Sequence, residues 1–190
     1  MKSKPYLGNE LENIDIIVAG CKNGDRKAQE RLYKNYYRAM MTLCLRYTKN
    51  DADAVEVLNT GFLKVFKNIQ RYDSGQASLY TWIRTVVINS CIDFIKQKQK
   101  LEQTKELNED IQIHVYPEVF SKMKADELLQ LVRKLPSATQ AVFNLYSFEG
   151  YSHKEIGQIL NISEGTSKWH LSEARKNLQE LIKEPKIKIS

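Results

Sequence analysis

The chain has 190 residues, of which 42% are hydrophobic and 27% are charged, and its formal net charge is +6. This hydrophobic content is enough for packed cores and excludes an intrinsically disordered chain, while the positive charge favours a polyanionic partner such as nucleic acid. The sequence holds eight glycines, four prolines and few runs of alternating β-branched residues. We therefore expect an almost entirely helical protein.

The cysteines and the N-terminal segment indicate the cellular compartment of the protein. Cys21, Cys44 and Cys91 lie far apart, without a CxxC pair. This pattern predicts small core residues in a reducing environment rather than a disulfide framework or a zinc site. The segment after Met1 is polar and lacks an apolar signal region, and no run approaches about eighteen consecutive apolar residues. We expect a cytoplasmic protein.

The first half of the chain shows helical patterns separated by polar breaks. Asp25 can cap a helix whose apolar residues recur every three or four positions as far as Tyr47. After residues 49–51, a second helix is predicted with an inward stripe of Val55, Leu58, Phe62, Phe66 and Ile69. Turn formers at residues 71–78 precede a third helix from Leu79 to about Lys100. We assign these helices to an N-terminal domain, residues 1–100.

The helical spacing of apolar residues weakens after residue 100 and returns later in the chain. Residues 101–120 contain five acidic residues against Lys105 alone, a charge of −4, and Pro117 would interrupt a helix. We predict a flexible acidic linker over residues 101–124. Helical spacing returns at residues 128–135, stops at Pro136 and resumes through residues 142–146. With the motif that follows, this predicts a C-terminal domain of helices over residues 125–190.

Two short helical patterns in the C-terminal domain pivot on residues 161–163. Ser163 can cap the second helix, whose first turn begins with the small Gly165. Such a pair, with a basic second helix, suits the major groove of DNA, where it forms a helix-turn-helix. The alternative is an ordinary helical hairpin with a solvated charged face. The residues expected to face outward are Thr166, Lys168, Trp169, His170, Ser172, Arg175 and Lys176.

Residue types typical of catalysis do not cluster in this sequence. His114, His153 and His170 are scattered, and there is no His-Glu-x-x-His motif, acidic metal loop or glycine-rich phosphate loop. Asp53 and Glu56 form an acid/base pair only in principle, since a solvated helix face explains them better. We predict no enzyme activity, metal, cofactor or small-molecule substrate.

Several spaced motifs together resemble those of the extracytoplasmic-function (ECF) sigma factors of bacterial RNA polymerase. In the first half they are residues 53–66, DAVEVLNTGFLKVF, and residues 78–83, SLYTWI, followed by Asn89 and Asp93. In the second half they are residues 135–143, 150–156 and 164–166, with Ala174 and Arg175. The resemblance covers most of the chain and implies an all-α fold of two small domains, the C-terminal one a helix-turn-helix. It implies a factor that binds core polymerase, directs it to specific promoters and helps melt promoter DNA.

The resemblance also implies roles for individual positions. The helix-turn-helix would bind the upstream promoter element. The second helix would dock on the clamp coiled coil of the polymerase large subunit through Asp53, Glu56, Asn59 and Phe62. The loop and third helix would read the proximal promoter element and capture an unstacked base through Tyr72, Ser78, Arg84, Asn89, Asp93 and Lys96. We expect Trp82 to be a core residue rather than a base-stacking one.

Some positions depart from the family pattern. Asn59 and Thr60 stand where Gln and an acidic residue are more common, and Trp169 and His170 stand where basic or small residues are common, so the promoter sequence is not implied. The acidic linker would occupy the RNA channel of the polymerase or serve as a simple tether. A membrane-linked anti-sigma factor is a further partner that the family suggests. The alternative function is a stand-alone helix-turn-helix operator-binding regulator, whose first domain senses a ligand or dimerises.

Overall fold

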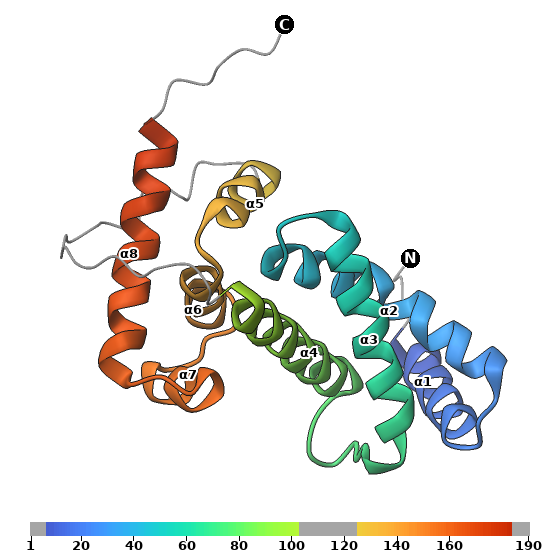
Figure 1. The fold of residues 1–190 in the computed structure, drawn as a ribbon. Helices are drawn as coiled ribbons and strands as arrows, with labels where there is room; N and C mark the ends of the chain where they lie inside the picture. The colour runs from blue at the N-terminus through green and yellow to red at the C-terminus, as the bar shows by residue number, and fades with distance from the viewer. Residues whose placement is uncertain (1–6, 103–124, 184–190) are drawn as a thin grey trace, which may run out of the picture. The chain divides into compact units, whose positions relative to one another are not determined.

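The computed structural model describes the backbone of residues 7–102 and 125–183, and side chains within residues 14–98 and 126–183. In these ranges the regular elements are helices (Figure 1). The expected all-α fold is confirmed. Most of the predicted linker, residues 103–124, lies outside the described residues. The elements are α1 (Leu7–Lys22), α2 (Arg26–Tyr47), α3 (Asp51–Asn68), a 3-10 turn η1 (Ile69–Arg71), α4 (Leu79–Glu102), α5 (Ala125–Lys134), α6 (Ser137–Ser147), α7 (His153–Leu160) and α8 (Glu164–Lys183).

The described residues divide into two compact units. The first unit contains the described residues up to Cys44 together with Val55–Ser90. The second contains Leu45–Ala54 and the described residues from Cys91 onward. The end of α2, the start of α3 and the second half of α4 therefore belong with the C-terminal helices. This division differs from the predicted domain boundary at residue 100.

The first unit is built on amphipathic helices with local caps. Asp25 Oδ1 accepts a hydrogen bond from the backbone N–H of Lys27 at 2.8 Å, which satisfies one free donor at the start of α2. Leu32, Met40 and Leu43 of α2 are buried at helical spacing. The predicted start and inward face of this helix are confirmed.

Helix α1 was not predicted from the sequence. Its inward residues Ile17, Val18 and Cys21 are buried, whereas Ile16 is exposed. Polar contacts join its end to the turn after α3: Lys22 Nζ donates to the carbonyl of Tyr72 at 3.1 Å, and the Gln70 amide donates to the carbonyl of Lys22 at 2.5 Å. The run Ile16-Ile17-Val18 was an available signal for this helix.

The inward face of α3 corrects the predicted stripe. Val55 is 41% exposed, so its assignment to the core was wrong. Leu58, Phe62 and Ile69 are buried as predicted, and Ala54, Val57 and Val65 are buried as well, so the inward face lies partly to one side of the predicted stripe. The close approach of α3 to α4 uses Gly61, where an added Cβ would lie 3.1 Å from a Val87 methyl carbon.

The second unit packs α6 and α7 against the long helix α8 (Figure 1). Helix α6 follows Pro136 and is buried throughout residues 139–145. Ile156 of α7 and Leu171, Ala174 and Leu178 of α8 complete this core. The predicted helical pattern on both sides of Pro136 is confirmed, and four helices, α5 to α8, lie in the described residues from position 125 onward.

Candidate functional site

The turn between α7 and α8 is fixed by local hydrogen bonds. Ser152 and Glu155 form a capping box at the start of α7, and Asn161 ends this helix in the left-handed conformation at φ 59°. Ser163 Oγ accepts from the backbone N–H of Thr166 at 2.9 Å, which caps α8 as predicted. The predicted helix-turn-helix is therefore present, with its pivot at Asn161-Ile162-Ser163.

Gly157 allows this turn to close. A Cβ placed on Gly157 would lie 2.8 Å from the backbone oxygen of Ile162, closer than real Cβ contacts. The Gly157 carbonyl also accepts a hydrogen bond from the N–H of Ile162 at 3.0 Å. The crossing of α7 and α8 thus depends on the absence of a side chain at this position.

Most of the residues predicted to face outward on α8 are accessible. Thr166 and Lys168 are exposed, and Lys168 forms an exposed ion pair with Glu164 at 2.7 Å. Intermediate exposure is found for Trp169, Ser172, Arg175 and Lys176. The first turn of α8 thus offers hydroxyl and ammonium groups, and later turns offer two further cations.

His170 corrects the sequence expectation. Its Nδ1 is 3.0 Å from Thr139 Oγ1 of α6, and burial lowers the pKa of its imidazole. With Ile95, Ala138 and Leu160 it lines a small cavity of about 50 Å³. His170 therefore lies against α6 rather than on the outward face, because its helical position is one step beyond that of Trp169.

His153 is a residue of this region that the sequence reasoning did not select. Its Nδ1 is 2.9 Å from Oγ of the buried Ser167, and its ring stacks on Tyr146 with centroids 4.7 Å apart. Burial first, and then Lys168 and Arg175, lower the pKa of His153, with Glu164 opposing them. The His153 side chain therefore links α6, α7 and the first turn of α8. Its partners are distant from it in the sequence, so helical periodicity did not indicate this role.

The loop before α4 is held by its own polar side chains. Asp73 Oδ1 accepts from the N–H of Gly75 at 2.9 Å, and Ser78 Oγ accepts from the N–H of Thr81 at 3.2 Å. Ser78 therefore caps α4 while remaining exposed. Tyr72 is 9% exposed, and its ring packs on Trp82 at a centroid distance of 5.5 Å.

Tyr72 is thus a correction to the predicted DNA-contacting set. Its hydroxyl donates to the carbonyl of Ala77 at 3.2 Å, and burial raises its pKa. Both the ring and the hydroxyl of Tyr72 make contacts within the protein. Tyr72 therefore holds the loop in position and does not offer its ring to DNA. Trp82, which was expected to be a core residue, packs on Tyr72 but has intermediate exposure.

The remaining predicted residues of α4 are accessible. Asn89 and Asp93 are exposed, and Arg84 has intermediate exposure. Lys96 is exposed, and its Nζ donates to the carbonyl of Ile159 at 2.9 Å. In this conformation Lys96 therefore satisfies a carbonyl in the last turn of α7.

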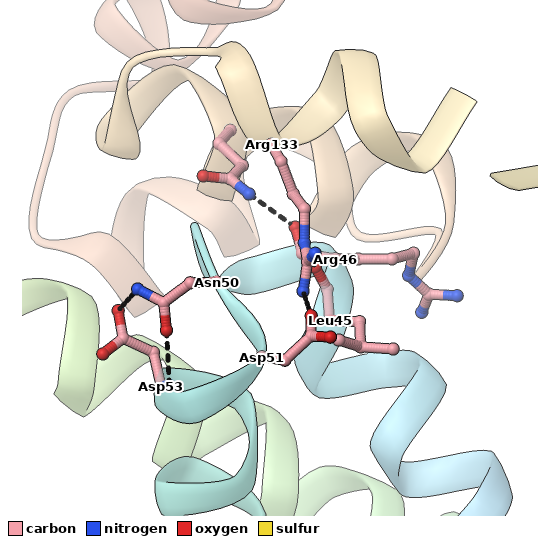
Figure 2. A network of polar contacts seen from close by, with 7 residues as sticks. Leu45, Arg46, Asn50, Asp51, Asp53 and Arg133 are labelled. Carbon is pink, nitrogen blue, oxygen red and sulfur yellow. Dashed lines mark hydrogen bonds and ion pairs between the residues drawn. The ribbon is translucent and has the colours of Figure 1, made fainter. Parts of the chain in front are cut away.

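Figure 2 shows how the start of α3 is built. Asn50 Oδ1 accepts from the backbone N–H of Asp53 at 2.8 Å, and the Asn50 amide donates to Asp53 Oδ2 at 3.1 Å. Lys98 of α4 pairs with the same carboxylate at 2.6 Å, leaving the Asp53 side chain 15% exposed. Asp53 is therefore largely engaged in capping α3.

The other predicted polymerase-contacting residues of α3 divide into two groups. Glu56 and Asn59 are exposed, and Asn59 Oδ1 accepts from the Tyr33 hydroxyl at 3.1 Å. Phe62 is 2% exposed and its ring lies 4.7 Å from that of Tyr33, so its assignment to the contact surface was wrong. It is a core residue because it follows Leu58 by four positions on the inward face.

Within the described ranges, no group of three or more His, Cys, Asp or Glu residues is placed to hold a metal ion. In the same residues, no helix combines the length and apolar character that crossing a membrane requires.

Comparison with known protein families agrees with this arrangement. The sigma-70 region 2 family matches residues 32–101, and the sigma-70 region 4 family matches residues 125–178. The ECF RNA polymerase sigma factor SigM of Mycobacterium tuberculosis is 25% identical over 179 residues, covering 92% of this chain and 86% of that protein. SigW of Bacillus subtilis is 28% identical over 179 residues, covering 88% and 95% respectively.

A solved structure shares the fold. It is the sigma factor RpoE in complex with the anti-sigma factor NepR from Bartonella quintana, with a TM-score of 0.51 and 18% sequence identity, covering 81% of this chain and 96% of that one. The two sigma-70 regions together span residues 32–101 and 125–178, in the same order as their motifs in the sequence. The chain belongs to the extracytoplasmic-function sigma factors.

Proposed function

We propose that this chain acts in the cytoplasm as a promoter-directing subunit of RNA polymerase and performs no chemical step itself. The observation that carries the proposal is the helix-turn-helix with its accessible basic helix α8, joined in one chain to a region 2 fold with an exposed polar face on α3. Binding energy applied to the two promoter elements would direct the enzyme and favour melting, while core polymerase makes the phosphodiester bond.

The accessible residues support specific assignments. In this proposal Thr166, Lys168 and Trp169 would meet base edges, and Arg175 and Lys176 would meet phosphates of the upstream element. Glu56 and Asn59 are exposed, and in this proposal they would contact a basic clamp helix. An anti-sigma factor, held at a membrane in our proposal, would keep the chain inactive. Co-purification from cells would identify it.

The central experiment measures promoter binding with and without core polymerase. We expect tight, sequence-specific binding and run-off transcription only when core polymerase is present, because a single helix-turn-helix without a second half-site binds duplex DNA weakly. A specific nanomolar complex of the purified chain with duplex DNA would contradict this proposal. It would favour the stand-alone operator-binding regulator instead.

Base capture is assigned to the exposed face of α4. Asn89→Ala should impair open-complex formation more than polymerase binding, because its amide can bond the edge of an unstacked base. Permanganate footprinting on duplex and pre-melted templates separates the two steps. The control is Gln97→Ala, which removes another exposed amide from the same helix. If a pre-melted bubble fails to rescue Asn89→Ala, the residue does not act in capture.

A further inference from the structure

The C-terminal end of α2 is capped by side chains that lie far along the chain. The last four carbonyls of an α-helix have no partner within the helix. Here Arg133 Nε donates to the carbonyl of Leu45 at 3.1 Å (Figure 2). The amides of Gln140 and Asn144 donate to the carbonyl of Arg46 at 2.8 and 2.6 Å. Residues of α5 and α6 therefore satisfy the end of α2 within the second unit.

The capping is reciprocal. Lys49, just after α2, donates from Nζ to the carbonyl of Arg133 at 3.0 Å and to that of Leu135. These carbonyls are at the C-terminal end of α5. Each of the two helix ends, which carry partial negative charge, thus receives a cation from the other segment.

Two ion pairs reinforce the contact. Arg46 pairs with Glu149 at 2.7 Å, and the Glu149 side chain is fully buried. The Arg46 guanidinium also lies over the ring of Phe148, 4.7 Å from its centroid. Arg133 pairs with Asp51, in the first turn of α3, at 2.7 Å (Figure 2). We call this set the carbonyl clasp: Leu45, Arg46, Lys49 and Asp51 with Arg133, Gln140, Asn144 and Glu149.

The chemistry of the clasp suits a contact that opens. Gln140 and Asn144 are fully buried, yet both are polar and four positions apart on one face of α6, whereas Ala141, Val142 and Leu145 supply its apolar core. Hydrogen bonds exchange for water at small net cost, unlike apolar burial. The same holds for the Arg133–Asp51 pair, whose Asp51 side chain is 78% exposed. The clasp also joins a segment of region 2 to a segment of region 4.

We propose that the carbonyl clasp is an autoinhibitory contact that competes with core polymerase for the acidic start of α3. This inference rests on the proposed function. In the closed clasp Arg133 pairs with Asp51, so the charge of Asp51 is engaged by α5 and is not free to attract a basic clamp helix. The pair of Asp53 with Lys98 lies outside the clasp. Core polymerase binds the fraction of molecules whose clasp is open, which reduces its apparent affinity by that fraction.

The decisive variant is Glu149→Arg, which places a second cation against Arg46. If the clasp is open in roughly 10% of wild-type molecules, we expect about tenfold tighter binding to core polymerase. Hydrogen exchange of residues 44–51 and 133–149 in the chain alone should become faster. The double variant Arg46→Glu/Glu149→Arg restores opposite charges and should return both measurements toward wild type. Glu180→Arg, an equal charge change at an exposed position of α8, is the control.

A second variant distinguishes opening of the clasp from misfolding of the chain. Arg133→Gln removes the pair with Asp51 without reversing a charge, and should shift both measurements in the same direction. Unchanged exchange in both single variants, or faster exchange without tighter core binding, would overturn the competition. If no form of the chain, wild type included, bound core polymerase, the proposed function would fail and the competition with it. The exchange data would still show whether the clasp opens.

Discussion

His170 shows how a single side chain on α8 can serve packing instead of recognition. Because its Nδ1 is paired with Thr139 and its ring is half-buried, His170→Ala should lower the free energy of unfolding by about 1 to 2 kcal/mol. It should weaken binding to matched and mismatched promoters equally. Denaturant unfolding and promoter competition measure the two effects. Unchanged stability with altered base preference would contradict this assignment and restore the original outward placement.

Thr60 is an exposed residue of α3 that departs from the family pattern. Thr60→Glu adds a negative charge beside Asn59 on the face proposed to meet a basic clamp helix. We expect tighter core binding, by about 0.2 to 1 kcal/mol for an exposed ion pair, with unchanged promoter choice. Competition with another sigma factor for limiting core polymerase measures the change in affinity for core polymerase. The matched control is Thr85→Glu, on an exposed position of α4. Weaker binding would mean that Thr60 packs against the clamp.

Among the elements, the α7–α8 turn depends most on one position. Gly157→Val would drive a side chain into the Ile162 carbonyl, where a Cβ alone would already lie at 2.8 Å. We expect a loss of about 1 to 3 kcal/mol in stability, as for other overpacked sites, and loss of upstream-element binding. Thermal unfolding by circular dichroism measures the first effect. Gly165→Ala is the control, because its Cβ would have an ordinary 3.6 Å contact with Ser163. Equal stability of the two variants would contradict the argument.

The packing of α6, α7 and α8 should also weaken at acidic pH. The pKa values of His153 and His170 are lowered from 6.5, in both cases chiefly by burial. The unfolded chain therefore binds protons more readily, so this contribution to stability is complete above about pH 6.5 and is lost as the pH falls toward the folded-state pKa values. Denaturant unfolding from pH 5 to 8 would measure it. In the double variant His153→Asn/His170→Asn the pH dependence over this range should flatten, and an unchanged slope would exclude both histidines as its source.

At the scale of the whole molecule, electrostatics set how promoter binding responds to salt. The chain carries a formal charge of +6, and each cation on a DNA phosphate releases counterions. Arg175→Ala in the polymerase complex should weaken all promoters alike and reduce the slope of log affinity against log salt by about 1. The control Lys27→Ala removes an equal charge from an exposed position of α2. If both variants change the slope equally, net charge rather than a phosphate contact is responsible.

What the sequence determined by itself was local. The caps at Asp25 and Ser163, the break at Pro136 and the helical periodicity depend on neighbours a few residues away, and these predictions were confirmed. The exposed positions Thr166, Lys168, Glu56 and Asn59 followed from the same periodicity. Family motifs then supplied the function, which periodicity alone does not specify.

Only the tertiary structure decided which way the ambiguous side chains turn. Phe62, Tyr72 and His170 each fit a helix or loop pattern in two ways, and their burial depends on rings and hydroxyls contributed by other elements. The carbonyl clasp is likewise beyond prediction from sequence patterns, because its residues are far apart in the chain. Arg46 and Glu149, for example, are 103 positions apart. A helix end that lacks carbonyl partners is apparent from the sequence, but the donors that cap it are chosen by how distant segments pack.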